Sequence, residues 1–65
     1  MGNIAQYFEE TYNLRLNGEA CIAELLQRSV HAVHIKVMGR DIDTGIPQCI
    51  LLPSDEIHSA AQRIT

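Results

Sequence analysis

Gly39-Arg40-Asp41-Ile42-Asp43-Thr44-Gly45-Ile46-Pro47-Gln48-Cys49-Ile50-Leu51-Leu52-Pro53-Ser54-Asp55-Glu56-Ile57 is the stretch that decides how this 65-residue chain folds. Its first part, residues 39–47, is rich in glycine, aspartate and proline, which favour turns. The short apolar run 49–52 ends at a proline, as a strand often does. Ser54 can cap a following helix, and Asp55 and Glu56 suit the positive end of that helix's dipole. The stretch therefore predicts a loop, a strand and a helix.

A second strand is expected just upstream. In residues 33–38, Val33, Ile35 and Val37 alternate with His34, Lys36 and Met38. A period of two is typical of a strand that is buried on one face. Because a turn-rich loop joins this strand to the apolar run 49–52, we expect the two strands to be antiparallel.

Two helices should precede the strands. Apolar and aromatic residues recur at helical spacing over 4–13, with Asn3 as a cap, and again from Glu19 to near Ser29, after the breaker pair Asn17-Gly18. Arg63 suits the last turn of the final helix. The prediction is one small domain, residues 1–65, of the α+β class, in the order α-α-β-β-α, with a two-stranded antiparallel sheet packed on helices. The expected core consists of Phe8, Ile22, Leu25, Leu26, Val33, Ile35, Val37, Ile50 and Leu52.

Composition excludes several classes of partner. The net charge is −3, and the five lysines and arginines are scattered along the chain, so the positive face that a nucleic acid requires is missing. No apolar run approaches the roughly 20 residues of a membrane span, and no leader sequence is evident. We expect a cytoplasmic protein in which Cys21 and Cys49 are buried, reduced thiols.

Catalytic and metal-binding patterns are not found. His31, His34, His58 and the two cysteines lack the spacing of a zinc site. Ser29, Ser54 and Ser59 lack a nucleophile elbow, and no phosphate-binding glycine loop occurs. The acidic pairs Glu9-Glu10, Asp41-Asp43 and Asp55-Glu56 are interpreted as solvated charges. We therefore expect no enzyme activity, no catalytic residue, no metal and no cofactor.

Residues 39–57 resemble, without a gap, the pattern G-R-[DN]-x-x-x-G-[LIV]-P, then a strand, then S-x-E-I, of the MreB family of bacterial actins, the rod-shape-determining proteins. Upstream, residues 7–19 resemble that family's Y-x-x-x-x-Y-N-L…G-E segment. The resemblance implies the small upper-lobe subdomain of an actin-like ATPase, which lies over the nucleotide cleft. The family's phosphate loops and catalytic acids belong to other subdomains.

The resemblance also implies a nucleotide contact and a role. Glu24 is the nearest counterpart of a family glutamate that approaches the nucleotide's sugar and base, whereas Gln27 stands where the family has lysine. We expect ATP binding that is weak or absent in isolation, with a dissociation constant of about a millimolar or worse. The leading hypothesis is a non-catalytic MreB-like interaction module of the cell-shape cytoskeleton that binds a protein partner or self-associates. The alternatives are a free-standing regulatory module with an unrelated partner and a small metal-dependent enzyme.

Overall fold

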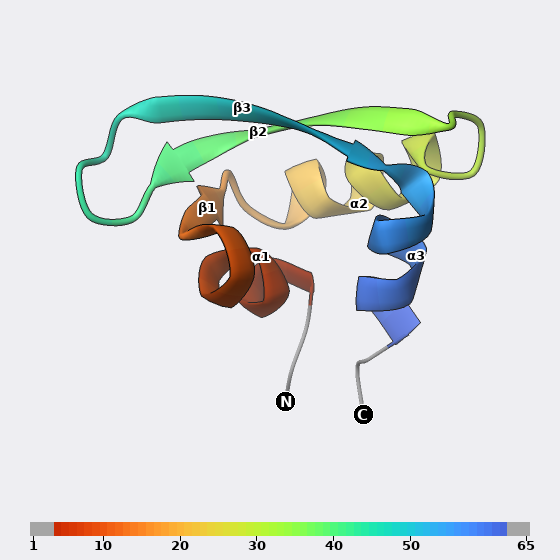
Figure 1. The fold of residues 1–65 in the computed structure, drawn as a ribbon, viewed down its shortest axis with the longest axis horizontal. Coiled ribbons are helices and arrows are strands. Elements are labelled where there is room, and N and C mark those ends of the chain that lie inside the picture. Colours follow the sequence, from red (N-terminus) through yellow and green to blue (C-terminus); the bar gives the residue numbers. More distant parts are fainter. Residues whose placement is uncertain (1–3, 63–65) are drawn as a thin grey trace.

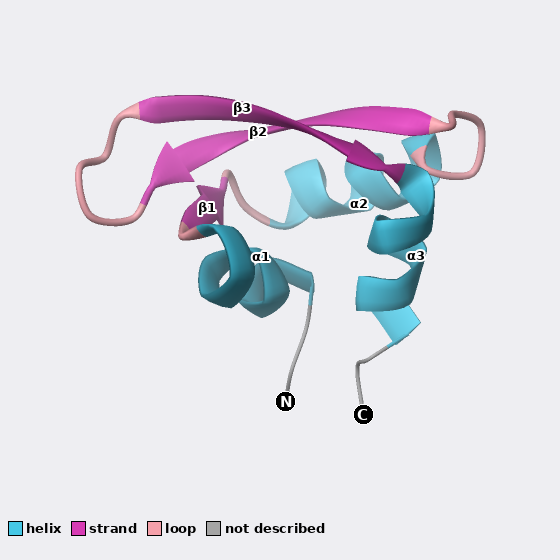
Figure 2. Ribbon diagram, in the orientation of Figure 1, coloured by secondary structure: helices cyan, strands magenta, loops and turns pink. Residues whose placement is uncertain are grey.

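The computed structural model describes residues 4–62, apart from the side chain of Glu19. Its elements are α1 (Ile4–Tyr12), β1 (Leu14–Leu16), α2 (Glu19–Arg28), β2 (His34–Asp41), β3 (Pro47–Pro53) and α3 (Ser54–Gln62). The α+β class is confirmed (Figures 1 and 2). The expected roles of Asn3, Arg63 and the Glu19 carboxylate fall outside the described residues.

The sheet has three strands, so the predicted order α-α-β-β-α was wrong and the observed order is α-β-α-β-β-α. The additional strand, β1, pairs antiparallel with β2, and Leu16 lies opposite Gly39. Asn13, with a φ of 54°, turns the chain out of α1, and its carbonyl accepts a hydrogen bond of 3.0 Å from the Ile42 amide. A three-residue Leu-Arg-Leu stretch is too short for its alternation to be recognised, and pairing with β2 makes it a strand.

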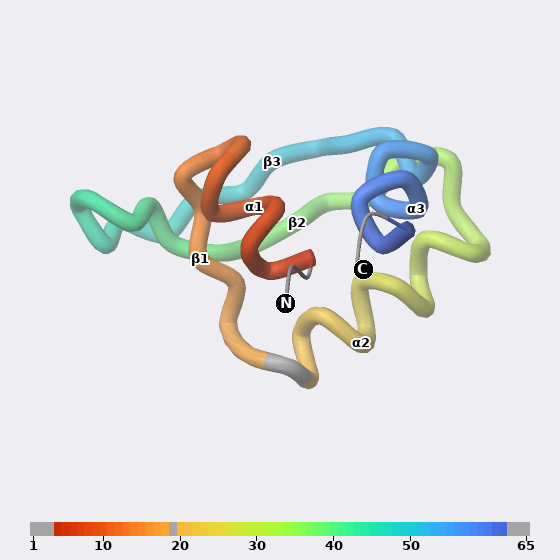
Figure 3. The backbone as a smooth tube through the Cα atoms, turned by 90° about the horizontal axis from the view of Figure 1, so that it is seen from below, coloured from red at the N-terminus to blue at the C-terminus, as the bar shows by residue number. Residues whose placement is uncertain are grey.

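The two expected strands do form an antiparallel hairpin, in which Ile35 pairs with Leu52 and Val37 with Ile50. Odd-numbered residues of β2 point inward and even-numbered residues point to solvent, as the alternation predicted. The sheet makes one layer and the helices lie below it (Figure 1), with α2 beside β2 in the view from below (Figure 3).

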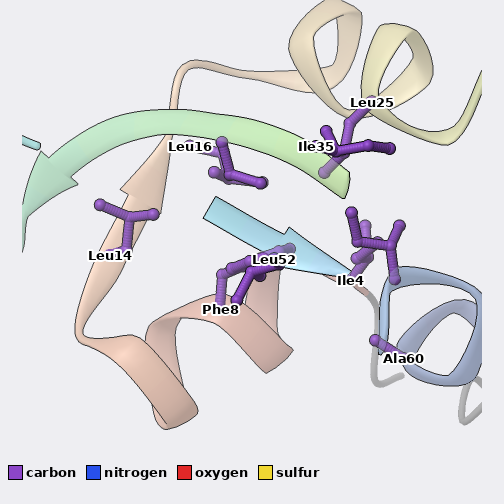
Figure 4. Close-up of a cluster of buried hydrophobic side chains, with 10 residues drawn as sticks. Ile4, Phe8, Leu14, Leu16, Leu25, Ile35, Leu52 and Ala60 are labelled. Atoms are coloured by element: carbon purple, nitrogen blue, oxygen red, sulfur yellow. The ribbon is translucent and has the colours of Figure 1, made fainter. Parts of the chain in front are cut away.

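The core lies between the inward face of the sheet and the three helices (Figure 4). Of the expected core residues, Phe8, Leu25, Ile35, Val37 and Leu52 are buried, while Ile22, Leu26 and Ile50 are half-buried against them. Val33 was wrongly placed in the core: it is 75% exposed because β2 begins only at His34. The core residues that the sequence analysis did not name are Ile4, Leu14, Leu16, Ile57 and Ala60.

The hairpin loop is closed by Asp41. One oxygen of its carboxylate accepts hydrogen bonds from the backbone N–H groups of Asp43 (2.9 Å) and Thr44 (3.0 Å). The bond from the Thr44 amide, more than that from Asp43, lowers the pKa of Asp41. Gly45 adopts a φ of +73°, which glycine allows without strain, and Arg40 donates to its carbonyl at 3.0 Å. Asp41 is thus part of the loop's structure, as well as a solvated charge.

A carboxylate joins α1 to α3. Glu56 on α3 accepts a hydrogen bond of 2.7 Å from the Tyr7 hydroxyl and another from the Tyr12 hydroxyl, both on the same oxygen. The bond to Glu56, together with desolvation and the negative charge of Glu56, raises the pKa of Tyr12 to about 12. The two tyrosines therefore hold the first helix against the last helix through one acidic side chain.

Gly39 lies where three strands meet, opposite Leu16 on one side and Gln48 on the other. A Cβ atom at this position would lie 2.5 Å from the carbonyl oxygen of Arg15 and 2.9 Å from Cγ of Leu14. The backbone oxygen cannot move away without breaking the β1–β2 pairing, so the sheet requires glycine at residue 39.

We expect the substitution Gly39→Ala to lower the free energy of unfolding by about 2 to 3 kcal/mol, because the added methyl group forces β1 away from β2. Urea denaturation followed by circular dichroism measures this change. The control is Gln48→Ala on the other side of Gly39, an exposed position where the loss should stay below about 0.5 kcal/mol. Equal stability of the two variants would contradict the close approach at Gly39.

We also expect stability to fall in alkali through Tyr12. Its pKa in the folded chain, about 12, lies above the ordinary value of 10.0, so the unfolded chain loses this proton first. The stabilisation is therefore present below pH 10 and disappears as the pH rises towards 12. Residue-specific NMR of the Tyr12 ring measures the titration, and in Glu56→Gln it should shift to lower pH. A ring that titrates at its ordinary value in both proteins would rule out the Glu56 contact.

Candidate functional site

One hollow of the described surface lies between α2 and the adjoining edge of β2. It has a volume of about 310 Å³ and is lined by Asn17, Cys21, Glu24, Leu25, Arg28, Lys36, Val37 and Met38. Its position follows from the short β1, which pairs with β2 only at residues 39–41 and leaves the rest of that edge to α2 (Figure 3). The space is thus a consequence of the sheet topology.

A second hollow of about 330 Å³ lies over the part of the hairpin where residues 38–40 of β2 pair with residues 47–49 of β3. Its lining residues are Asn17, Met38, Gly39, Arg40, Pro47, Gln48 and Cys49. Asn17 and Met38 line both hollows. We call the two together the α2–β2 groove.

The groove combines an apolar floor with a predominantly positive rim. Leu25 and Val37, at its base, are 5% and 2% exposed and belong to the core. The lining includes three exposed cationic side chains and one exposed acidic side chain, namely Arg28, Lys36, Arg40 and Glu24. Such a surface suits a partner that offers carboxylates together with apolar groups.

The face of the hairpin that points away from the core also combines a cationic side chain with exposed apolar side chains. The register places Lys36 beside Leu51 and Met38 beside Cys49, all on the face that points away from the core. Met38 is 62% exposed and Leu51 is 65% exposed. Met38, Cys49 and Leu51 thus place exposed apolar side chains on this face of the hairpin.

Glu24, the nucleotide contact implied by the resemblance, lies in the wall of the α2–β2 groove. Gln27 is exposed on the same helix and is absent from the lining of either hollow. Lys36 and Met38 were not predicted to belong to a site. Their signal was present in the alternation of 33–38, which marks the outward row as clearly as the inward one.

The two thiols differ from the prediction. Cys21 is half-buried and lines the groove, but Cys49 is exposed. The reason is the strand register: Cys49 pairs with Met38, whose side chain points outward, whereas Ile50 pairs with the inward Val37. Treating 49–52 as a uniformly apolar run concealed its two faces.

The described residues hold no group of three histidine, cysteine or acidic side chains that is placed to bind a metal ion. Ser29 is buried and donates to the carbonyl of Leu26 at 2.7 Å, which accounts for its hydroxyl. Among residues 4–62, no helix has the length and apolar character needed to cross a bilayer. The groove itself offers charged and apolar side chains for contact.

Comparison with known proteins adds no relative: no protein-family model, no curated protein and no solved structure matches this chain.

Proposed function

We propose that this chain is a non-catalytic, MreB-like protein-binding module related to the cell-shape cytoskeleton, and that it acts in the cytoplasm by docking its α2–β2 groove and outward hairpin face on a protein partner. The proposal joins two lines of support. One is the resemblance of residues 39–57 to the family's hairpin. The other is a surface suited to binding.

The first line of support comes from the hairpin. The residues that define the family pattern each have a structural role in forming this one hairpin. Gly39 permits the close approach of Arg15, and Gly45 supplies a positive φ. Asp41 closes the loop with its carboxylate. Ser54 begins α3 and donates its N–H to the carbonyl of Val33 at 2.8 Å. Residues that serve one hairpin together are more informative than isolated glycines and prolines.

The second line of support is the makeup of the groove. Its rim holds Arg28, Lys36 and Arg40 in a chain that is acidic overall. Concentrating positive charge around an apolar floor favours an acidic protein surface over a neutral one. We assign the groove a role in binding, because its cationic side chains and apolar floor suit an acidic protein surface.

Nucleotide affinity is a subordinate part of the proposal. Glu24 offers one hydrogen-bond acceptor to a ribose or base, which contributes only a fraction of the roughly 4 kcal/mol that a millimolar complex requires. Gln27 lacks the charge of the lysine that the family has at this place. We therefore assign ATP binding in isolation a dissociation constant of about a millimolar or worse.

Co-sedimentation with polymerised MreB-family filaments tests the proposed function. We expect the chain to pellet with the filaments, and the double variant Arg28→Gln, Lys36→Gln to bind about five- to tenfold more weakly, because it neutralises two rim charges. Arg15→Gln is the matched control: this arginine lies outside the groove, 4.0 Å from Glu9. Circular dichroism checks that all three chains are folded.

Two results would contradict the proposal. One is a chain that stays in the supernatant at every filament concentration. The other is a double variant that binds as well as the Arg15→Gln control. A free-standing regulatory module with an unrelated partner would give the first result, and a metal-dependent enzyme would give it together with activity that a chelator abolishes.

A further inference from the structure

The free edge of β3 has a defined hydrogen-bonding pattern. The Asp41 amide donates to the carbonyl of Ile46 at 2.9 Å, and the Ser54 amide donates to the carbonyl of Val33 at 2.8 Å. These two bonds fix the phase of the antiparallel ladder, in which paired residues alternately face each other and face away. The even-numbered residues of β3 therefore turn their backbone groups towards β2. The odd-numbered residues, 47, 49, 51 and 53, turn theirs outward.

Both prolines of β3 fall on outward positions. Pro47 and Pro53 have no N–H, so the edge presents two donors, the amides of Cys49 and Leu51, between two residues that only accept. In the order β1-β2-β3, no strand of the described chain covers this edge. Figure 3 shows β3 on the side of the hairpin away from α2.

The edge has proline at both of its ends, which limits pairing there, but it has no charge to repel a second strand between them. Natural edge strands commonly carry lysine or another charge that repels a second strand. β3, with the sequence Pro-Gln-Cys-Ile-Leu-Leu-Pro, carries no charged side chain. Leu51 is 65% exposed and Cys49 is exposed, so the two residues whose N–H groups are free at the edge also carry exposed apolar side chains.

We propose that β3 pairs antiparallel with β3 of a second copy of this chain, across a two-fold axis at Ile50, to make a continuous six-stranded sheet. This register overlaps all seven residues of both strands, and Cys49 of each copy faces Leu51 of the other. All four outward N–H groups, two from each copy, then find carbonyl partners. The prolines face each other at the ends, where no donor is left unpaired.

The side chains favour a second copy as the occupant of the edge. When two β3 strands pair, no like charges face each other, because β3 has no charged side chain. On the inward side, the half-buried Ile50 meets Ile50 of the second copy, which covers apolar surface that the single chain leaves partly open. Because a two-fold axis through the sheet keeps both helical layers on one side, the two cores become continuous.

This inference deepens the protein-binding function proposed above by naming a second copy as one partner, and it uses the β3 edge instead of the groove. Two paired strands of about 23 Å make a small interface. We therefore expect a weak dimer, with a dissociation constant of about 10 micromolar or higher.

Sedimentation equilibrium over a concentration series tests the pairing. The wild-type chain should pass from monomer to dimer. Leu51→Pro removes one outward N–H without touching the ladder to β2, and we expect dimerisation to weaken by about thirtyfold because two hydrogen bonds are lost per dimer. Leu51→Ala, which keeps the N–H, is the matched control and should weaken it less. Circular dichroism compares the folds of the three proteins.

Disulfide trapping tests the register without relying on a proline. In the variant Leu51→Cys, Cys21→Ser, mild oxidation by oxidised glutathione should give a covalent dimer linked from Cys49 to the introduced cysteine of the other copy. Facing residues in such a pair lie about 5.5 Å apart between Cα atoms, within disulfide range. The Cys21→Ser chain alone, with only Cys49, should cross-link much less.

Three outcomes would overturn the inference. They are a chain that remains monomeric at millimolar concentration, a dimer that Leu51→Pro does not weaken, and a cross-link formed as readily by the Cys21→Ser chain alone. A monomeric chain that still co-sediments with filaments would refute the β3 pairing and leave the proposed function standing. A dimer that does not co-sediment with filaments would support the β3 pairing and contradict the proposed function.

Discussion

The contact around Gly39 is the constraint on which the rest of the molecule depends. At this residue β2 holds a strand on each side, and the carbonyl of Arg15 comes closer than any Cβ atom would allow. The pairing fixes the register of the sheet, and the register decides which side chains point inward. Through β1 it also ties the hairpin to α1, since Asn13 lies between that helix and the strand and accepts from Ile42 in the hairpin loop.

The sequence predicted what depends on local pattern and missed what depends on pairing. The alternation of 33–38 and the loop residues 39–47 were sufficient for the β2–β3 hairpin, because period and turn chemistry are local signals. β1 was missed since three residues carry no measurable period. The misplacement of Val33 and Cys49 has the same origin: the boundary of a strand and the face of an apolar residue are set by the partner strand. Glu24 was named as a site residue only through the family resemblance. The groove around it exists because β1 is short, and β1 could not be predicted from any local sequence pattern.

One sheet therefore supplies two kinds of surface. Its inward face is closed by three helices, and the Tyr7 and Tyr12 hydroxyls bound to Glu56 hold the first and last of them together. Among the described residues, no further strand pairs with its edge at β3 or with the part of the β2 edge beside α2, and positive charge lies near α2 but not along β3.

Amide hydrogen exchange along β3 tests whether this edge is open in the single chain and pairs with a second copy. It reports in one measurement which amides are bonded to β2 and whether the free edge is covered. We expect the amides of Gln48, Ile50 and Leu52 to be protected at every protein concentration. Those of Cys49 and Leu51 should exchange rapidly in dilute solution and become protected as the concentration rises. Uniform protection along the strand in dilute solution, or rapid exchange of Cys49 and Leu51 at all concentrations, would contradict the claim that this edge is open and pairs with a second copy.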